Sequence, residues 1–162
     1  MACNHTTNII VSGLGGQGVL KVTDILAEAL FESGFDVKKS EVHGMSQRGG
    51  SVSSEVRFGG RVASPMVPEG ECDILAVIEP EQLEAALVNL RAGGVLITPD
   101  DVPVKELKHR KALNIMILGA LAAHLPVVPA EVWRRCVAAA FPEHLRKLNL
   151  EMFELGFAAV KR

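Results

Sequence analysis

The segment GLGGQG, residues 13–18, is the first stretch of this sequence whose residue types and spacing could do chemistry. It fits the spacing G-x-G-x-x-G, follows a β-branched run and precedes a helical pattern, so its bare amides could hold a phosphate at the positive end of a helix. A tight turn that packs a strand against a helix explains the same glycines without a ligand. Gln17 favours a site, because a polar side chain at this helix start has no role in a core. The ligand-binding candidates in this segment are Gly13, Gly15, Gly16, Gln17 and Gly18.

The end of the next predicted strand indicates which phosphate ligand would fit. A dinucleotide site usually places an acidic residue about 20 residues beyond the glycines, where it binds a ribose. This sequence has Lys38 and Lys39 there, with Glu41 beyond them. The pattern disfavours ordinary NAD binding, and it favours a phosphorylated ligand that pairs with the two lysines.

The segment HGMSQRGG, residues 43–50, is the second stretch that could do chemistry. Arg48 precedes two glycines that permit close backbone approach, and Met45 is an apolar side chain that an isolated loop would expose. The alternative is a polar surface loop with a chance arginine. His43 by itself is more often a hydrogen-bonded structural residue than a catalyst. We therefore expect an interface or a ligand site here, with His43 and Arg48 as the catalytic candidates.

The elements that must position these segments alternate between strand and helix patterns. Residues 8–13 predict a strand, 19–34 a helix that stops at Gly34, and 35–42 a second strand reached by a parallel crossover. The loop before residues 51–58 is too short for a crossover helix, so that strand is expected to be antiparallel. The pair Gly59-Gly60 predicts a hairpin turn into residues 61–65, as a flap or sheet edge.

The second half of the chain continues the alternation. We expect a buried strand at 72–80, a helix at 81–94 closed by Gly93 and Gly94, a strand at 95–101, and helices at 111–126, 129–141 and the carboxyl terminus. The fold class is therefore α/β, a Rossmann-like three-layer sandwich with a mostly parallel sheet and an antiparallel hairpin or edge. In such a sheet the strand-to-helix loops meet at the carboxyl edge, which brings both glycine segments beside Glu79-Pro80 and Thr98-Pro99.

Composition limits the class of protein. The chain has 162 residues, 48% of them apolar. This content is enough to bury a core in one domain spanning the whole chain, residues 1–162. The net charge of -2 and the aromatic content of only 4% disfavour nucleic acid as a partner. The start lacks the pattern of a signal peptide, and the longest apolar run is too short to cross a bilayer, so we expect a cytoplasmic protein that does not enter a membrane.

Cysteine spacing and the remaining motifs point to an incomplete active site. Cys3, Cys72 and Cys136 are far apart in the sequence. This spacing fits reduced thiols and matches no zinc or iron-sulfur ligand set, so no metal is expected on this chain. No nucleophile elbow, HExxH pair or defensible carboxylate pair is present. The chain has the features of half an active site.

Several quoted segments resemble a known family. GLGGQGVL, SEVHGMSQRGGSVSSEVRFG, ILAVIEPEQLEAAL, LNIMILGAL and NLEMFELGF are similar to the gamma-type domain of the 2-oxoacid:ferredoxin oxidoreductases, over nearly the whole chain. The form HGMSQRGG resembles the indolepyruvate branch, in which this domain is the small beta subunit.

The resemblance implies a reaction and a division of labour. Such a complex oxidatively decarboxylates an aryl pyruvate such as indolepyruvate, passes electrons to ferredoxin and forms an acyl-CoA. Thiamine diphosphate, Mg and the iron-sulfur clusters would lie on a large alpha subunit. The glycine loop of this chain would face either the phosphate-bearing part of coenzyme A, with Lys38 and Lys39 as further anion contacts, or a segment of the partner. By resemblance the active-site wall facing the partner comprises Gly44, Met45, Ser46, Gln47, Gly49, Gly50, Glu79 and Asn114, with Arg48 pairing a carboxylate or phosphate. The resemblance also leaves room for a homodimer when the chain is expressed alone.

One departure from the family and two alternative functions remain open. Between Val104 and Ala112 the sequence has only KELKHRK, where the family usually inserts a further strand and the start of a helix. One alternative is a stand-alone NAD(P)-binding or nucleotide-sensing domain in which the glycine loop does all the work. The other is a scaffold that keeps the fold without a site.

Overall fold

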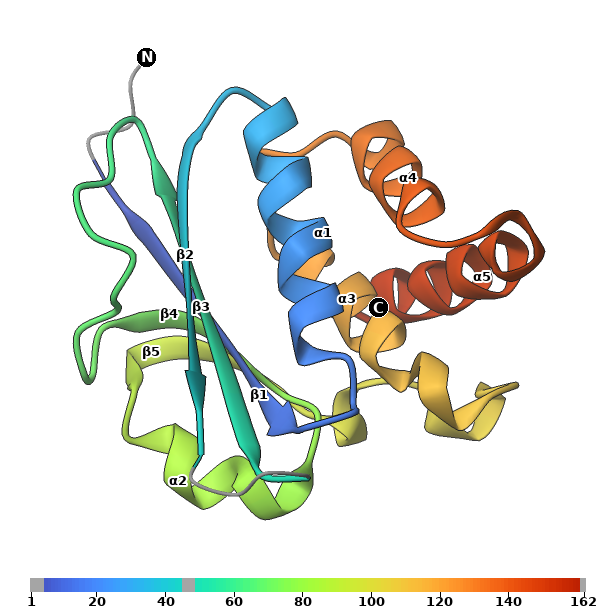
Figure 1. The fold of residues 1–162 in the computed structure, drawn as a ribbon, viewed down its shortest axis with the longest axis horizontal. Coiled ribbons are helices and arrows are strands. Elements are labelled where there is room, and N and C mark those ends of the chain that lie inside the picture. Colours follow the sequence, from blue (N-terminus) through green and yellow to red (C-terminus); the bar gives the residue numbers. More distant parts are fainter. Residues whose placement is uncertain (1–4, 45–48, 161–162) are drawn as a thin grey trace.

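The strands and helices of the computed structural model, which describes residues 5–44 and 49–160, follow the predicted alternation (Figure 1). In chain order they are β1 (Thr7–Leu14), α1 (Val19–Glu32), β2 (Asp36–His43), β3 (Ser51–Gly59), β4 (Cys72–Val77), α2 (Leu83–Leu87), β5 (Leu90–Ile97), α3 (Leu113–Ala123), α4 (Ala130–Ala139) and α5 (Glu143–Val160). Short 3₁₀ turns occur at Pro80–Gln82, Pro99–Asp101, Val104–Glu106 and Arg110–Ala112.

The strands of the described residues form one mixed sheet of five in the order β2-β3-β1-β4-β5. β1 and β4 are parallel, as are β4 and β5, whereas β3 is antiparallel to both β2 and β1. All of these strands except β3 therefore run in one direction. The α/β class and the mostly parallel direction of the strands are confirmed.

The predicted hairpin at Gly59-Gly60 is wrong. β3 lies inside the sheet between β2 and β1, and its hairpin partner is β2. Residues 60–71 form no strand, and side chains of neighbouring strands hold them instead: Val62 N donates to Asp36 (2.7 Å) and Val67 N to Glu55 (2.6 Å). Pro65 and Pro68 in this segment lack the N–H groups that a ladder requires.

The helix predicted over residues 81–94 is also wrong in its second half. α2 ends at Leu87, and the sequence from Leu90 belongs to β5. The register between β4 and β5 shifts between Cys72, which faces Leu90, and Ile74, which faces Val95. The glycines predicted to stop a helix therefore lie in a β irregularity. Gly93 has a φ of 76° there, in the left-handed region that suits glycine.

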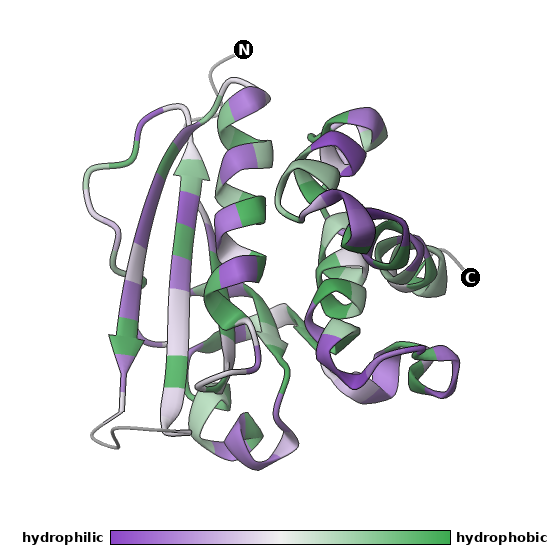
Figure 2. Cartoon of the chain, turned by 45° about the vertical axis from the view of Figure 1, so that its right-hand side comes forward, coloured by the Kyte–Doolittle hydropathy of each residue, from purple (hydrophilic) through white to green (hydrophobic). Residues whose placement is uncertain are grey.

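Helices cover the two faces of the sheet unequally. On one face α1 and α3 pack against the strands, with α4 and α5 outside them; of the described residues, the other face has the five-residue α2 and residues 60–71 (Figure 1). Figure 2 shows α1 with alternating hydrophilic and hydrophobic bands, as expected of a helix with one face toward a core. No helix in the described part of the chain is both long and apolar enough to span a bilayer.

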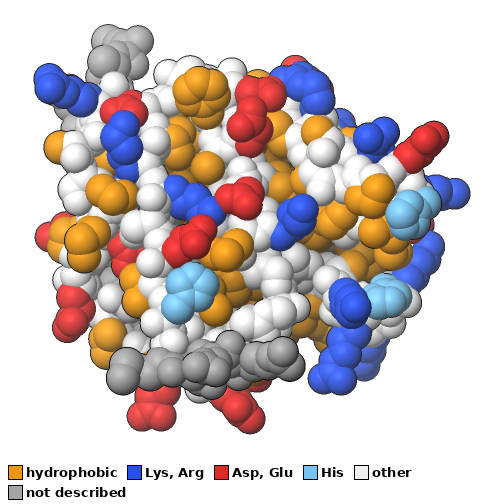
Figure 3. All heavy atoms as spheres, in the orientation of Figure 1, with side chains coloured by type: hydrophobic (Ala, Val, Ile, Leu, Met, Phe, Trp, Pro, Cys, Tyr) orange, Lys and Arg blue, Asp and Glu red, His pale blue; other side chains and the backbone are white. Residues whose placement is uncertain are grey.

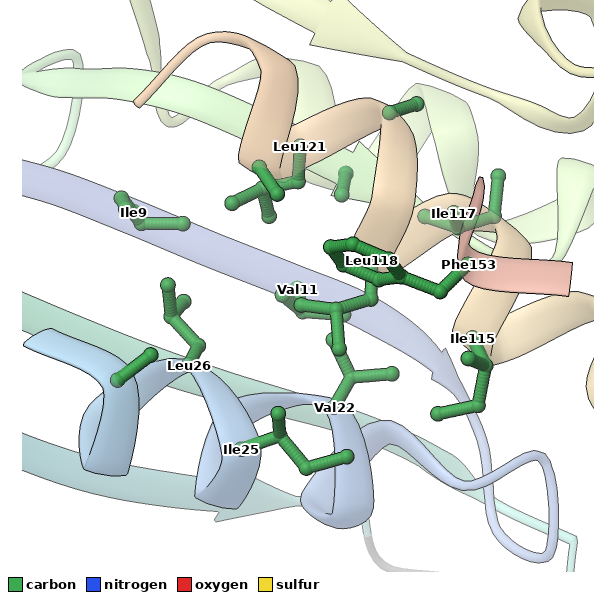
Figure 4. Packing of buried hydrophobic residues seen from close by; sticks show 14 of the residues in the cluster. Ile9, Val11, Val22, Ile25, Leu26, Ile115, Ile117, Leu118, Leu121 and Phe153 are labelled. Atoms are coloured by element: carbon green, nitrogen blue, oxygen red, sulfur yellow. The ribbon is translucent and has the colours of Figure 1, made fainter. Parts of the chain in front are cut away.

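The main core lies between β1, α1 and α3. Ile9 and Val11 of β1 meet Leu26 of α1 and Leu118 of α3, and Phe153 of α5 closes the cluster (Figure 4). α3 is buried continuously from Asn114 to Ala122, because the sheet covers one of its sides and α5 another. This central position holds the start of α3 against the start of α1.

Glycines set the closeness of α3 and α5. A Cβ atom on Gly119 would collide with the carbonyl oxygen of Phe153, and one on Gly156 would collide with that of Met116. The two backbones are therefore in direct contact, and neither collision can be relieved by turning a side chain.

We predict that Gly119→Ala and Gly156→Ala each destabilise the chain. In an exposed helix the change from glycine to alanine stabilises by up to about 1 kcal/mol. Here overpacking against a backbone should reverse the sign and cost about 1–3 kcal/mol or more. Urea unfolding of the two variants checks the prediction, and an unchanged or raised free energy of unfolding for both would contradict it.

Candidate functional site

The loops after β1 and β2 touch at the carboxyl edge of the sheet. Gly15 N donates to the carbonyl oxygen of Gly50 (2.8 Å), and Gly44 N to that of Ser51 (2.7 Å). The expected meeting of the two glycine segments is therefore found at Gly15 and Gly50. Met45, Ser46, Gln47 and Arg48, which carry much of the second prediction, lie outside the described residues.

The glycine loop presents backbone at the start of α1. Gly16 and Gly18 have φ values of 88° and 77°. Both angles lie in the left-handed region, which glycine adopts readily. Gly15 and Gly16 are exposed, and Gly18 is the N-cap of α1, with no side chain among the described residues capping this helix. The amides at the positive end of α1 are consequently open to an anion.

Gln17 braces the loop. Its Oε1 accepts from Leu14 N (2.7 Å), and its Nε2 donates to Oε2 of Glu79 (2.8 Å), which follows β4. Glu79 in turn accepts from Glu81 N at 3.4 Å. Both polar ends of Gln17 are thus used within the chain, so this ligand-binding candidate acts as a positioning residue between two loops.

Asn114 joins the starts of two helices. Its Nδ2 donates to the carbonyl oxygen of Gly18 (3.2 Å), which ties α3 to α1. The residue is 6% exposed, and its Oδ1 has no hydrogen-bond partner among the described residues. A buried amide oxygen without a donor is uncommon and points to a group that the chain alone does not supply.

These loops border a hollow of about 690 Å³. Its wall combines the glycine loop with the ends of β4 and β5 and with the segment that leads into α3. The lining residues are Gly16, Gln17, Ile78, Glu79, Pro80, Pro99, His109, Arg110, Lys111, Leu113 and Asn114. Figure 3 shows basic and histidine side chains gathered at the lower right, where Figure 1 places the segment between β5 and α3.

The structure places Lys38 and Lys39 away from this hollow. Both lie within β2, which continues to His43 at its carboxyl end. Lys39 is thus several residues, about 13 Å, short of that end. Lys38 pairs with Asp36, and Lys39 with Asp24 and Glu41. The two lysines therefore contribute to ion pairs on β2 and do not line the hollow.

The ion pairs of Lys39 also set its protonation. Burial alone would lower the pKa of Lys39, but hydrogen bonds to the carboxylates of Asp24 and Glu41 outweigh this effect and raise the pKa. The ammonium group is therefore held in its charged form by partners within the chain.

His43 lies on the other side of the glycine loop. It ends β2, is mostly exposed, and its Nε2 lies 3.7 Å from a carboxylate oxygen of Glu41. A separate hollow of about 390 Å³ brings it near Gly15, Gly16 and Gly18. His43 and Asn114 thus flank the same loop from different hollows.

Sequence reasoning missed His109, Arg110 and Lys111 as site residues. The sequence signal that could have indicated them is the cationic run KHRK, residues 108–111, shortly before Asn114. The His109 Nδ1 accepts from Lys111 N (3.3 Å) and caps the short turn Arg110–Ala112 that leads into α3. This turn carries the two cations to the rim of the hollow.

Metal-ligating and thiol groups are spread apart in the described part of the chain. No group of three or more His, Cys, Asp or Glu side chains gathers there as a metal site would. Cys72 and Cys136 are free and buried, and burial raises their pKa values to about 12 and about 11.

The arrangement at the carboxyl edge can bind an anion and present backbone amides to it.

The buried thiols should be unreactive. In a Cys3→Ser variant at pH 8, we expect neither Cys72 nor Cys136 to react rapidly with a disulfide reagent, because the thiolate is the nucleophile and both sites disfavour it. Two thiols should react in denaturant. A rapidly titrating thiol in the native variant would contradict the burial described above.

The brace through Gln17 predicts a pH-dependent defect. In Gln17→Glu two carboxylates face one another, which raises the pKa of the pair in the folded state. A raised carboxyl pKa means that the loss of stability is present at neutral pH and shrinks as pH falls through about 5. We expect a loss of about 1–3 kcal/mol at pH 7 by urea unfolding.

The matched control exchanges the two groups. Gln17→Glu/Glu79→Gln restores one donor facing one carboxylate and should recover most of the lost stability at pH 7. A defect of equal size at pH 7 and pH 4.5, or no recovery in the double variant, would show that the contact does not brace the loop.

Comparisons with known proteins agree with the fold and show the family. The model of the family described as pyruvate ferredoxin/flavodoxin oxidoreductase matches residues 8–159. An indolepyruvate oxidoreductase subunit IorB of Pyrococcus horikoshii is 44% identical, with 95% of this chain and 96% of that protein covered. The subunit of the same name from Methanothermobacter thermautotrophicus is 31% identical, with 94% and 96% covered.

The Pyrococcus relative is also longer. Its alignment runs over 194 positions yet takes in 95% of the 162 residues here, so that protein has about 40 positions without a counterpart in this chain. A shorter chain is consistent with the expected departure before α3.

Solved structures show the same architecture. The gamma subunit of a keto/oxoacid ferredoxin oxidoreductase from Geobacter sulfurreducens superposes with a TM-score of 0.78 at 28% identity, over 96% of this chain and 98% of that one. A 2-oxoglutarate:ferredoxin oxidoreductase from Magnetococcus marinus shares the fold at 21% identity and a TM-score of 0.78, over 96% of this chain but 31% of that one. With its family model matched almost from end to end, the chain belongs to the pyruvate ferredoxin/flavodoxin oxidoreductase family.

Proposed function

We propose that this chain is the small subunit of a ferredoxin oxidoreductase that oxidatively decarboxylates an aryl pyruvate, with indolepyruvate as the leading substrate. The observation that carries the proposal is the 44% identity to an indolepyruvate oxidoreductase subunit over nearly the full length of both chains. An oxidoreductase role as a subunit also fits the gamma subunit from Geobacter.

The geometry supports a chain that completes a site formed with another subunit. Gly15 and Gly16 expose bare backbone at the carboxyl edge, and Asn114 holds a buried oxygen without a donor among the described residues. The buried oxygen is costly to leave without a donor, and the exposed backbone beside it suits contact with a second chain or a ligand. In the Magnetococcus structure the same fold occurs as 31% of a longer chain, so the fold is compatible with being one part of a larger assembly.

The partner we propose is a large alpha subunit that holds thiamine diphosphate with Mg and the iron-sulfur clusters. When bound there, thiamine diphosphate supplies the carbanion chemistry of decarboxylation and the clusters carry electrons to ferredoxin. The described residues of this chain then shape the wall: Gln17 and Asn114 position the glycine loop, and the loop ending at Gly50 closes against it. Coenzyme A is the co-substrate that would reach this edge, and the complex would work in the cytoplasm.

Reconstitution tests the proposal. The isolated chain should show no oxoacid oxidation, while the complex with its thiamine-bearing, cluster-bearing partner should oxidise indolepyruvate with ferredoxin or a viologen dye as acceptor. We expect a higher kcat/KM for indolepyruvate than for pyruvate or 2-oxoglutarate. Tight NAD(P) binding by the isolated chain, together with an inactive complex, would favour the stand-alone nucleotide-binding alternative instead.

Arg48 gives the matching mutational test. If its guanidinium pairs a carboxylate or phosphate in the assembled site, Arg48→Ala should lower kcat/KM of the complex by about 10- to 100-fold, the effect of losing one charge-assisted hydrogen bond. Arg61→Ala, which removes an exposed charge from the segment after β3, is the control and should leave kcat/KM unchanged. Equal rates for both variants would favour a scaffold without a site.

A further inference from the structure

A cavity of about 380 Å³ lies at the amino edge of the sheet, opposite the glycine loop. Its wall includes Thr7 at the start of β1, Asp73 near the start of β4 and Val127 beyond α3. The eight residues of β1 extend for about 25 Å from this edge to the glycine loop (Figure 1). This amino-edge pocket shares no lining residue with the hollow of about 690 Å³, so it is a separate site.

The irregularity in β5 places a cation in the wall of the amino-edge pocket. Cys72 faces Leu90 and Ile74 faces Val95, so residues 91–94 all lie opposite the single residue Asp73. Arg91, the first of these, turns onto that aspartate, with its Nε 2.6 Å from Oδ1. Irregularities of this kind are common beside sites, where they re-aim a side chain. Here the irregularity builds an ion pair at the pocket.

The ion pair presents its cation to the pocket and hides its anion. The Oδ1 of Asp73 accepts from Arg91 Nε, and its Oδ2 accepts from Asn8 N at 2.8 Å. The Nη1 of Arg91 donates to the carbonyl oxygen of Ala92 (3.3 Å), while its Nη2 has no partner among the described residues. The Arg91 side chain is 49% exposed, against 13% for Asp73. A ligand in the pocket therefore meets the guanidinium first.

Two histidines add hydrogen-bond donors to the same wall. His5 and His124 line the pocket together with Arg91. The described part of the chain gives neither imidazole ring a hydrogen-bond or ion-pair partner. An imidazole carries at least one N–H group in either protonation state. Because the carboxylate of Asp73 is already bonded, the balance of free groups around the pocket favours an anion.

The rest of the wall is apolar and indicates an organic ligand. The rings of Phe35 and Phe58 meet edge to face with their centroids 5.1 Å apart, and both line the pocket. The main apolar lining residues are Phe35, Phe58, Ile74, Val95, Leu125 and Val127. Ligand pockets span roughly 300–1,000 Å³, so a volume of about 380 Å³ suits one or two rings and not a nucleotide.

We propose that the amino-edge pocket binds a small aromatic monocarboxylate, with its carboxylate on Arg91 and its ring against Phe35 and Phe58. A guanidinium has five N–H donors, so Arg91 can bond a ligand carboxylate while it keeps Asp73. Since both oxygens of Asp73 are engaged, the pocket offers little to an ammonium group and favours a simple carboxylic acid over an amino acid. The site does not depend on the proposed reaction.

Nuclear magnetic resonance of the ¹⁵N-labelled full chain tests the site, with phenylacetate and indole-3-acetate as one-ring and two-ring probes. We expect saturable shifts of the amide signals of Thr7, Ile74 and Val127, and none for Gly15 and Gly16 of the glycine loop. Phenylacetamide lacks the charge and acetate lacks the ring. Each should bind at least tenfold more weakly than phenylacetate, because one of the two features that the pocket recognises is missing.

Arg91→Gln removes the proposed anion contact. Phenylacetate should bind this variant at least tenfold more weakly, while the weak binding of phenylacetamide should stay nearly unchanged, because only the charged group uses Arg91. Arg134→Gln is the matched control. It removes a cation of similar exposure, 54% for the side chain, from an ion pair with Glu154 outside the pocket, and should leave the affinity unchanged.

Val127→Glu tests the pocket without breaking an ion pair. Val127 is 51% exposed at the mouth, so the variant should fold, and its new carboxylate should weaken phenylacetate binding about fivefold by repulsion. Val88→Glu, at a position that is 58% exposed and outside the pocket, is its control. The amide spectrum of each variant shows whether the fold is kept.

Three results would overturn the proposal. The first is equal affinity for phenylacetate in wild type and Val127→Glu, or in wild type and a folded Arg91→Gln. The second is equal affinity of wild type for phenylacetate and phenylacetamide. The third is a set of amide shifts confined to the carboxyl edge of the sheet.

Discussion

The hydrogen bond from Asn114 to the carbonyl oxygen of Gly18 is the contact on which the carboxyl edge depends. It joins the first turn of α3, a deeply buried helix, to the N-cap of α1. The sheet, α1 and α5 enclose α3, so its first turn has little freedom to move. Because the Asn114 side chain is bonded to Gly18, it fixes the position of the glycine loop relative to that turn. Gly18 permits the contact because its φ is 77° and because a Cβ atom would collide with the Asn114 amide. The position of the loop is thus set by the packing of the core.

A second hydrogen-bonded contact, through Gln17, also holds the glycine loop. Gln17 links Leu14, at the end of β1, to Glu79, which follows β4. β1 and β4 are parallel neighbours, so their carboxyl ends lie at the same edge of the sheet. With Asn114 bonded to Gly18 and Glu79 bonded to Gln17, the loop is held at two neighbouring residues while Gly15 and Gly16 remain exposed. A site preorganised in this way spends little binding energy on ordering itself. Such an arrangement suits a chain that contributes a fixed wall to a larger assembly.

Several functional expectations followed from residue types and order alone, and others needed contacts between distant segments. The meeting of the glycine loop with Gly50 was predictable, since loops after parallel strands share one edge. The surroundings of Lys38 and Lys39 were not predictable: they follow the glycines at the spacing of a ligand contact, yet in β2 they pair with carboxylates of β2 and α1. Likewise the glycines at 93 and 94 resemble a helix stop, and only pairing with β4 shows that they lie where the strand register shifts.

By itself the sequence determined the α/β alternation, the buried helix LNIMILGALAA, the glycine loop before α1 and the family, because each of these depends on local periodicity or on a contiguous motif. Only the tertiary structure decided that β3 lies between β2 and β1, that Gln17 is a brace, and that Arg110 and Lys111 reach the rim where Asn114 is buried. Strand order and side-chain partners depend on which surfaces meet after folding. No local sequence pattern predicts a contact between residues that are far apart in the chain. Gln17 and Glu79 are 62 positions apart, and Gly18 and Asn114 are 96.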